Sequence, residues 1–362
     1  MAIRLIYATP ATDANLLYWG HFFTTDAFLA FEVEGQRYAV ANELEFAAMR
    51  EQSAFDGVLL PKDLVPEGEP KLINLIAAIS ERYPDETLLL PKNFPAALLL
   101  KIQKAELPYA IVEDEFLPER TAKTAEECDQ IREACRVTSL AFERAKMMLS
   151  QAEVTNGDLW LDGEYLTSER VRHEIENVCF QNGALAQETI VACGRSAACP
   201  HFRGSGRIRA NEFIVVDIFP CLRGSGYYGD MTRTFLKGQP TETQKAVYDA
   251  VQMVHDRTLE ALKVGVNAAS IHEKNIALFE NLGYETTDNM GFFHATGHGV
   301  GLEVHEAPGI GKQHIELKEG MVVTVEPGLY YPDIGGVRIE DVAVIYESSA
   351  ELLSNFPYDW IL

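Results

Sequence analysis

The strongest constraint on the fold is a set of acidic residues within segments that otherwise have the composition of buried strands. In EFIVVDIF, strand alternation places Phe213, Val215 and Asp217 on one face. YYGDMTRTF follows a loop that is long enough for a hairpin, and places Asp230 and Thr232 on one face. A carboxylate among apolar neighbours is costly unless it is paired or binds a metal ion. We therefore expect Asp217 and Asp230 to point into a common space.

A second pair of acids occurs near the C-terminus. MVVTVEPG places Thr324 and Glu326 on one face, and GVRIEDVAVIYE places Arg338 and Glu340 on one face. Either glutamate by itself would more often be an edge or salt-bridge residue. Four carboxylates directed into one space raise one another's pKa, so they stay ionised only with cations between them. Two divalent ions meet this requirement, and oxygen ligands with one imidazole suit Mn²⁺, Fe²⁺, Co²⁺ or Zn²⁺ rather than a structural zinc site.

The histidine-rich segment FFHATGHGVGLEVHE (292–306) offers that imidazole. His294 and His298 are four positions apart, as in a zinc-binding helix. However, each of three nearby glycines would cost a helix about 1 kcal/mol relative to alanine, and no glutamate follows His294 as in HExxH. We expect an extended segment in which one histidine completes the metal set and the others, including His305, contact substrate. His201, in the loop ACPHFRGSG, would by itself be an ordinary surface histidine.

Chain length and the order of elements predict two domains. Residues 1–118 alternate short strands and helices, and the polar segment LPERTAKTAEE (117–127) is the expected linker. The remainder repeats one plan, in which two helices are followed by strands. The helices are expected at about 124–150 and 168–182, and again at about 241–264 and 268–282, with capping boxes at Thr124/Glu127 and Thr241/Gln244. We expect two similar halves around one antiparallel sheet.

Composition excludes several classes of function. The formal charge of −23 repels nucleic acid and anionic membranes. The chain has neither a signal-peptide pattern nor a run of 18 apolar residues, and its six cysteines lack framework spacing. We therefore expect a cytoplasmic protein with reduced thiols.

Five motifs in order resemble the pita-bread metallopeptidases, a family that includes aminopeptidase P, prolidase and, more distantly, methionine aminopeptidase. They are PH at 200–201, VVDIF…GYYGDMTRTF, HATGHGVGLEVHE, TVEPGLY and GVRIED. The resemblance implies an α+β fold: a pita-bread catalytic domain at 119–362, with two pseudo-symmetric α-α-β halves around an antiparallel sheet. Residues 1–118 resemble the smaller creatinase-type α/β domain of the proline-specific branch, whose members are often homodimers.

The resemblance also implies the roles of individual residues. The metal ligands would be Asp217, Asp230, His298, Glu326 and Glu340, holding two divalent ions, with Mn²⁺ first and Co²⁺, Zn²⁺ or Fe²⁺ as alternatives. The catalytic residues would be His201, His294, His305, Glu326 as the proton shuttle, and Arg338.

The implied activity is hydrolysis of the bond between an N-terminal residue and proline, with an Xaa-Pro aminopeptidase as the first hypothesis and an Xaa-Pro dipeptidase (prolidase) as the alternative. A metal-free creatinase-like C–N hydrolase and a non-enzymatic binding module are further alternatives, but such relatives lack the ligand set. Three departures from the family pattern stand out. The two aspartates are thirteen positions apart, two more than usual; Gly229 replaces the usual serine; and Gly309 stands where prolidases tend to have an arginine.

Overall fold

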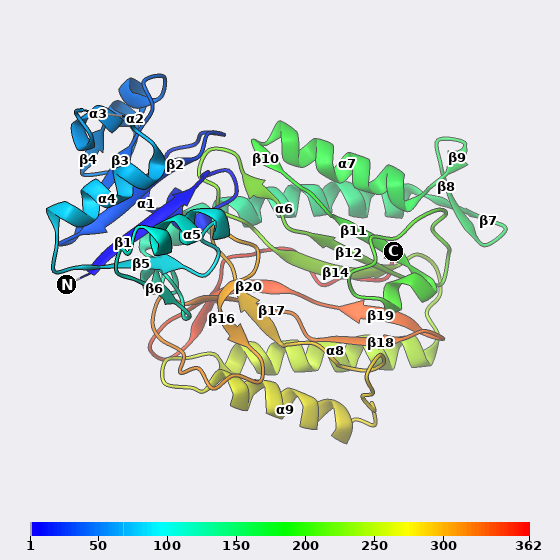
Figure 1. Cartoon of the computed structure of the whole chain (residues 1–362). Coiled ribbons are helices and arrows are strands. Elements are labelled where there is room, and N and C mark those ends of the chain that lie inside the picture. The colour runs from blue at the N-terminus through cyan, green and yellow to red at the C-terminus, as the bar shows by residue number, and fades with distance from the viewer. Residues whose placement is uncertain (1, 68) are drawn as a thin grey trace. The chain divides into compact units, whose positions relative to one another are not determined.

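The computed structural model describes residues 2–67 and 69–362 (Figure 1). They divide into two compact units, of which the first ends at Pro118 and the second begins at Glu119. Among these residues, no helix has both the length and the apolar character needed to cross a bilayer. All six cysteines are free thiols, as the sequence predicts.

The first unit is built on a mixed β-sheet. Its strands are β1 (Ala2–Ala8), β2 (Phe28–Val33), β3 (Gln36–Val40), β4 (Gly57–Leu59), β5 (Thr87–Pro91) and β6 (Tyr109–Val112), in the order β4-β3-β2-β1-β5-β6. Its helices are α1 (Ala14–Gly20), α2 (Phe46–Gln52), α3 (Pro61–Leu64), α4 (Leu72–Arg82) and α5 (Ala96–Lys104). Leu5 belongs to an apolar cluster with Ile76 of α4, whereas Ile6 belongs to one with Leu16 of α1. Alternate residues of β1 therefore pack against helices on opposite faces of the sheet.

The second unit consists of two halves with the same order of elements. The first half contains α6 (Ala125–Gln151), α7 (Ser168–Gln181), β11 (Ile190–Cys193), β12 (Phe213–Ile218) and β14 (Met231–Leu236). The second contains α8 (Glu242–Ala261), α9 (Ala268–Asn281), β15 (Gly297–Gly299), β16 (Glu306–Ile310), β17 (Val322–Val325), β20 (Asp341–Ile345) and β21 (Ala350–Leu352). Figure 1 shows α6 and α7 on one side of these strands and α8 and α9 on the other. The repeated plan predicted from the sequence is confirmed.

Smaller elements connect these parts. They are the 3-10 turns at Pro118–Arg120 and Gly194–Ala198, the hairpin strands β7 (Glu153–Thr155), β8 (Asp158–Leu161) and β9 (Glu164–Tyr165), and the pairs β10 (Ala184–Leu185) with β13 (Cys221–Leu222) and β18 (Gly328–Tyr331) with β19 (Gly335–Arg338). The antiparallel sheets β11-β12-β14 and β16-β15-β17-β20-β21 are linked by a bridge between Thr232 and Glu340. This bridge joins the two halves at the positions where the predicted ligands lie.

The predicted capping boxes start α6 and α8. The Thr124 hydroxyl accepts a hydrogen bond from the Glu127 amide, and the Glu127 carboxylate accepts one from the Thr124 amide. Thr241 and Gln244 form the same reciprocal pair at α8. The buried faces of the helices then pack against the strands: Phe142 of α6 clusters with Phe235 of β14. Helix packing thus fixes the strands that carry the site.

The histidine-rich segment is extended, as predicted. Residues 297–299 form β15, which pairs with β16 and β17. A Cβ atom on Gly297 would lie 1.9 Å from the carbonyl oxygen of Thr324, so only glycine allows β15 this close to β17. The glycines in this segment disfavour a helix and also permit the close packing of two strands.

Candidate metal centre and active site

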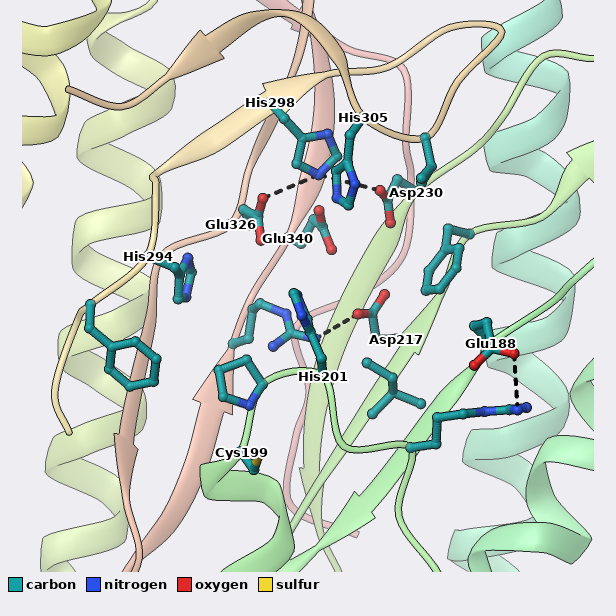
Figure 2. A pocket seen from close by; sticks show the side chains of 17 residues that line it. Glu188, Cys199, His201, Asp217, Asp230, His294, His298, His305, Glu326 and Glu340 are labelled. Atoms are coloured by element: carbon teal, nitrogen blue, oxygen red, sulfur yellow. Dashed lines mark hydrogen bonds and ion pairs between the residues drawn. The ribbon is translucent and has the colours of Figure 1, made fainter. Parts of the chain in front are cut away.

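The five predicted ligands surround one buried space in the second unit (Figure 2). They come from strand interiors or strand ends: Asp217 within β12, Asp230 before β14, His298 in β15, Glu326 after β17 and Glu340 before β20. Ligand atoms of Asp230, His298 and Glu340 all lie within 4.8 Å of one another. His298 Nε2 lies 3.2 Å from Glu326 Oε1.

Strand register brings the carboxylates together. Asp217 pairs with Thr232 across β12 and β14, and Thr232 pairs in turn with Glu340. The Thr232 hydroxyl donates a 2.7 Å hydrogen bond to Glu340 Oε2. The extra length between the two aspartates lies in the loop after β12, so it does not disturb this register. At Gly229, a Cβ atom would lie 2.6 Å from the carbonyl carbon of Ala134, which accounts for glycine where the family usually has serine.

Burial dominates the electrostatics of the cluster. It raises the pKa of Asp230 and of Glu340 well above their usual range, and the neighbouring carboxylates raise both pKa values further. Burial also raises the pKa of Glu326, against the opposing effects of His294 and Arg338. The metal-free cluster therefore keeps its protons to a higher pH than free carboxyl groups do.

The cluster fits divalent cations on structural grounds. Asp217 Oδ2 accepts a 2.6 Å hydrogen bond from Arg338, whereas Asp217 Oδ1 is buried and has no hydrogen-bond partner among the described residues. A single guanidinium cannot balance the four carboxylates of Asp217, Asp230, Glu326 and Glu340 that line this cavity. Carboxylate oxygens with one imidazole are the donor set of hard and borderline divalent ions.

Arg338 connects this cluster to a predicted substrate histidine. Its guanidinium donates to Asp217, to the Thr232 hydroxyl at 3.1 Å and to the Tyr330 hydroxyl at 2.9 Å. The Tyr330 oxygen lies 3.0 Å from His294 Nε2, and His294 Nδ1 lies 2.7 Å from the carbonyl oxygen of Ala295. Because a carbonyl only accepts, Nδ1 carries the proton and Nε2 accepts from Tyr330. Each hydrogen bond from Arg338 through Tyr330 and His294 to Ala295 therefore has a defined donor and acceptor.

The other two predicted histidines also face the cavity. The rings of His305 and His298 meet edge to face with centroids 4.2 Å apart. Burial lowers the pKa of His305, His298 and His294, so their neutral forms are favoured in the metal-free protein. His201 follows Pro200 at the cavity wall (Figure 2).

The cavity has a volume of about 470 Å³, which accommodates a short peptide. Apolar side chains line it beside the polar ones: Ile190, Phe219, Phe293 and Val304. Sequence reasoning did not identify these residues, nor Tyr330, Glu188 and Arg203. Tyr330 stood within the quoted motif TVEPGLY, but no spacing rule marked it as a partner of Arg338.

A second buried network holds the backbone beside Glu340. Arg233 donates to the carbonyl oxygens of Glu340 at 2.6 Å and Thr232 at 2.9 Å, and to Asp341 Oδ1 at 2.9 Å. Asp341 also accepts from Ser354, and His255 Nε2 lies 3.1 Å from its carboxylate. These cations and donors lower the pKa of Asp341 despite its burial. Asp341 is therefore an ionised anchor next to Glu340.

Comparisons with known proteins agree with this geometry. A sequence profile described as metallopeptidase family M24 matches residues 129–347. The Xaa-Pro dipeptidase of Pyrococcus furiosus is 35% identical over 248 residues, which cover 67% of this chain and 66% of that protein, just under two thirds of its length. The structure of prolidase from Pyrococcus furiosus superposes with a TM-score of 0.80 at 28% identity, covering 99% of this chain and 97% of the other. The X-Pro aminopeptidase from Thermotoga maritima superposes with a TM-score of 0.84 at 23% identity, over 100% and 98%, a likeness of fold.

Proposed function

Because the chain belongs to metallopeptidase family M24 and has the pita-bread fold, we propose that it is an Xaa-Pro dipeptidase. The reaction is hydrolysis of the peptide bond between an N-terminal residue and a following proline. The observation that carries this proposal is one cavity that contains all five predicted ligands together with His201, His294 and His305. The similar protein named Xaa-Pro dipeptidase supports the choice of substrate.

The dipeptidase replaces the aminopeptidase as the first hypothesis. The relative named as a dipeptidase is similar in sequence at 35% identity, whereas the structure named as an aminopeptidase, at 23%, supports only the fold. A dipeptide has a carboxylate directly on its proline, which needs a cationic or hydrogen-bonding partner. His201 is the candidate, because both ring nitrogens of His294 already have partners and the proposal gives His305 the reacting carbonyl oxygen. Arg338 is bonded to Asp217, and Arg203 lies beside Glu188 and Glu176.

An Xaa-Pro aminopeptidase is the second candidate, and Gly309 favours it. No described atom lies within 4 Å of the position that a Cβ would take on this residue. Where prolidases tend to have an arginine, this chain has neither a charge nor a side chain. An open position there would let a peptide continue beyond the proline.

We propose that the five ligands hold two divalent ions, most readily Mn²⁺, with Co²⁺, Zn²⁺ or Fe²⁺ as alternatives. Asp217, Asp230, Glu326 and Glu340 would supply the carboxylate oxygens that hold these ions, and His298 would supply the imidazole nitrogen. When bound, such ions supply Lewis acidity, which polarises a carbonyl group and makes water more acidic.

The protein's own residues would manage protons and orientation. Glu326 would take a proton from the attacking water on its carboxylate and deliver it to the proline nitrogen as the bond breaks. His305 would donate a hydrogen bond to the oxygen on which negative charge develops. His294, held by Tyr330 and Ala295, would present a fixed ring face to the proline.

The test is hydrolysis by metal-free protein reconstituted with Mn²⁺, Co²⁺ or Zn²⁺, using Ala-Pro, Ala-Pro-Ala and Ala-Ala. The proposal predicts cleavage of Ala-Pro alone. Cleavage of Ala-Pro-Ala would establish the aminopeptidase instead. Turnover of Ala-Ala at the rate of Ala-Pro would contradict proline selectivity, and no turnover of any peptide with any metal would overturn both candidates.

A further inference from the structure

A buried ion cluster lies directly beside His305. The next residue, Glu306, has a side chain that is only 6% exposed. Its Oε1 lies 2.6 Å from Lys123 Nζ, and its Oε2 lies 2.6 Å from the Arg120 guanidinium. The same guanidinium lies 2.9 Å from the carboxylate of Glu303, near the start of the His305 loop. Two carboxylates and two cations make the cluster electrically balanced.

The cationic side of this cluster is fixed by backbone contacts. The amide of Lys123 donates a 2.7 Å hydrogen bond to the carbonyl oxygen of Gly320, and Ala122 forms a bridge with Met321. Met321 directly precedes β17, the strand that leads to Glu326. The Lys123 side chain is 1% exposed, so its ammonium has little freedom to move. Lys123 therefore offers Glu306 a partner in a fixed place.

The loop of residues 301–306 packs closely around the Glu306 carboxylate. A Cβ atom on Gly301 would lie 2.4 Å from Glu306 Oε1, so the carboxylate occupies the space that a larger residue would fill. The amide of Glu303 donates to Glu306 Oε2 at 3.3 Å. In the strand ladder, Glu306 pairs with Gly299, the neighbour of His298. One carboxylate thus connects both ends of the short loop that carries His305.

His305 itself has few other restraints. Among the described residues, no hydrogen bond holds its imidazole, and its one ring contact is with His298. The orientation of the ring therefore depends on the backbone of residues 301–306. That backbone is held by Glu306 and its two cations.

We propose that Glu306, Lys123 and Arg120 form a clamp that positions His305 against His298 for turnover. This inference rests on the proposed function, in which His305 contacts the reacting carbonyl group. The clamp residues do not line the cavity, so they act through His305 and are positioning residues. A displacement of about 1 Å of a catalytic group is enough to cost on the order of 100-fold in rate.

The test separates positioning from stability by restoring charge balance. Lys123→Met and Glu306→Gln each leave one unmatched buried charge, so each should lower the melting temperature. The double variant leaves Arg120 paired with Glu303 and should recover much of that loss. If the cluster positions His305, kcat of the Mn²⁺-loaded double variant on Ala-Pro should stay at least about 10-fold below that of the parent. KM should remain within about threefold of the parent value, and the metal content should be unchanged.

A coupling measurement sharpens the test. His305→Ala should lower kcat of the parent by about 100-fold, but should lower kcat of the double variant by less than about 10-fold, because the ring is already misplaced. The matched control is Lys245→Met/Glu242→Gln, an exposed pair on α8 with a 2.7 Å separation, which should leave kcat unchanged. The clamp would be overturned if the double variant recovered kcat together with its melting temperature. It would also be overturned if His305→Ala lowered kcat by about 100-fold in both the parent and the double variant.

A crystal structure of the double variant tests the clamp independently of the proposed function. If the metal-loaded parent cleaves no Xaa-Pro peptide, the proposed function fails while the clamp can still be judged. The crystal structure of the double variant should then show His305 displaced from His298. A retained ring separation of 4.2 Å would overturn the clamp.

Discussion

The guanidinium of Arg338 lies 2.6 Å from the carboxylate of Asp217, and both groups are buried. The same guanidinium contacts Tyr330, whose hydroxyl reaches His294. One arginine therefore connects a predicted metal ligand to a predicted substrate residue. Its three contacts use different nitrogens of the planar group, a geometry that a point charge cannot reproduce.

Arg338→Lys should therefore be a severe change. A lysine ammonium cannot reach Asp217, Thr232 and Tyr330 together, so we expect kcat to fall by about 100-fold. Steady-state kinetics with Ala-Pro, together with metal analysis, would check this. Tyr330→Phe should leave the Asp217 contact intact and cost about 10-fold, so equal losses in the two variants would contradict the network.

His298 and His305 should separate metal binding from turnover. We expect His298→Ala to lose bound metal, because it removes the only imidazole of the proposed ligand set. His305→Ala should keep the metal and lower kcat by about 100-fold. Metal content by elemental analysis and kcat at saturating Mn²⁺ would decide. Metal loss in His305→Ala or in His294→Ala would show that the ligand set has been assigned wrongly.

The sequence predicted the fold because its signals were local. Capping boxes at Thr124 and Thr241 marked helix starts, and alternation in EFIVVDIF indicated a strand with an inward acid. The same alternation implied that Asp217 and Asp230 would share a space, and the structure brings them together. Their role as ligands stays a prediction.

The remaining parts of the site depend on contacts between distant positions. Lys123 and Glu306 are separated by 183 positions, and no periodicity links them. Tyr330 reaches Arg338 only because β18 folds back along β19. Gly229 departed from the family pattern, and the reason is the backbone of α6. Such close approaches depend on tertiary packing, which residue spacing does not encode.

Metal removal should make stability depend on pH. In the metal-free protein the folded-state pKa values of Asp230, Glu326 and Glu340 are raised. For a carboxyl with a raised folded pKa, the stabilising contribution is present below the unfolded pKa of about 4 and is lost as pH rises through the folded value. We therefore expect the melting temperature of the metal-free protein to fall as pH rises above the unfolded carboxyl pKa. The fall is measured relative to the melting temperature of the metal-loaded protein at the same pH.

Calorimetry of Mn²⁺ binding would check the raised carboxyl pKa values independently of the melting temperature. Mn²⁺ should displace protons from the cluster, so titrations at pH 7 in buffers of different ionisation enthalpy should show proton release. The stabilisation by Mn²⁺ should grow as pH rises above the ordinary range of carboxyl pKa values. Proton uptake on binding, or a metal effect on melting temperature that shrinks with rising pH, would contradict raised carboxyl pKa values.

Gly297→Ala should disrupt the metal centre without touching a ligand. The new Cβ would lie 1.9 Å from the Thr324 carbonyl oxygen, a separation that backbone atoms cannot tolerate, so β15 must move away from β17. His298 lies on β15 and Glu326 follows β17, so their 3.2 Å contact should be lost. We expect a loss of about 3 kcal/mol in stability and a Mn²⁺ affinity lowered by at least about 10-fold. Gly309→Ala is the matched control, because its Cβ would meet open space, and it should leave both quantities unchanged. Equal metal affinity in the two variants would show that the spacing of β15 and β17 does not set the site.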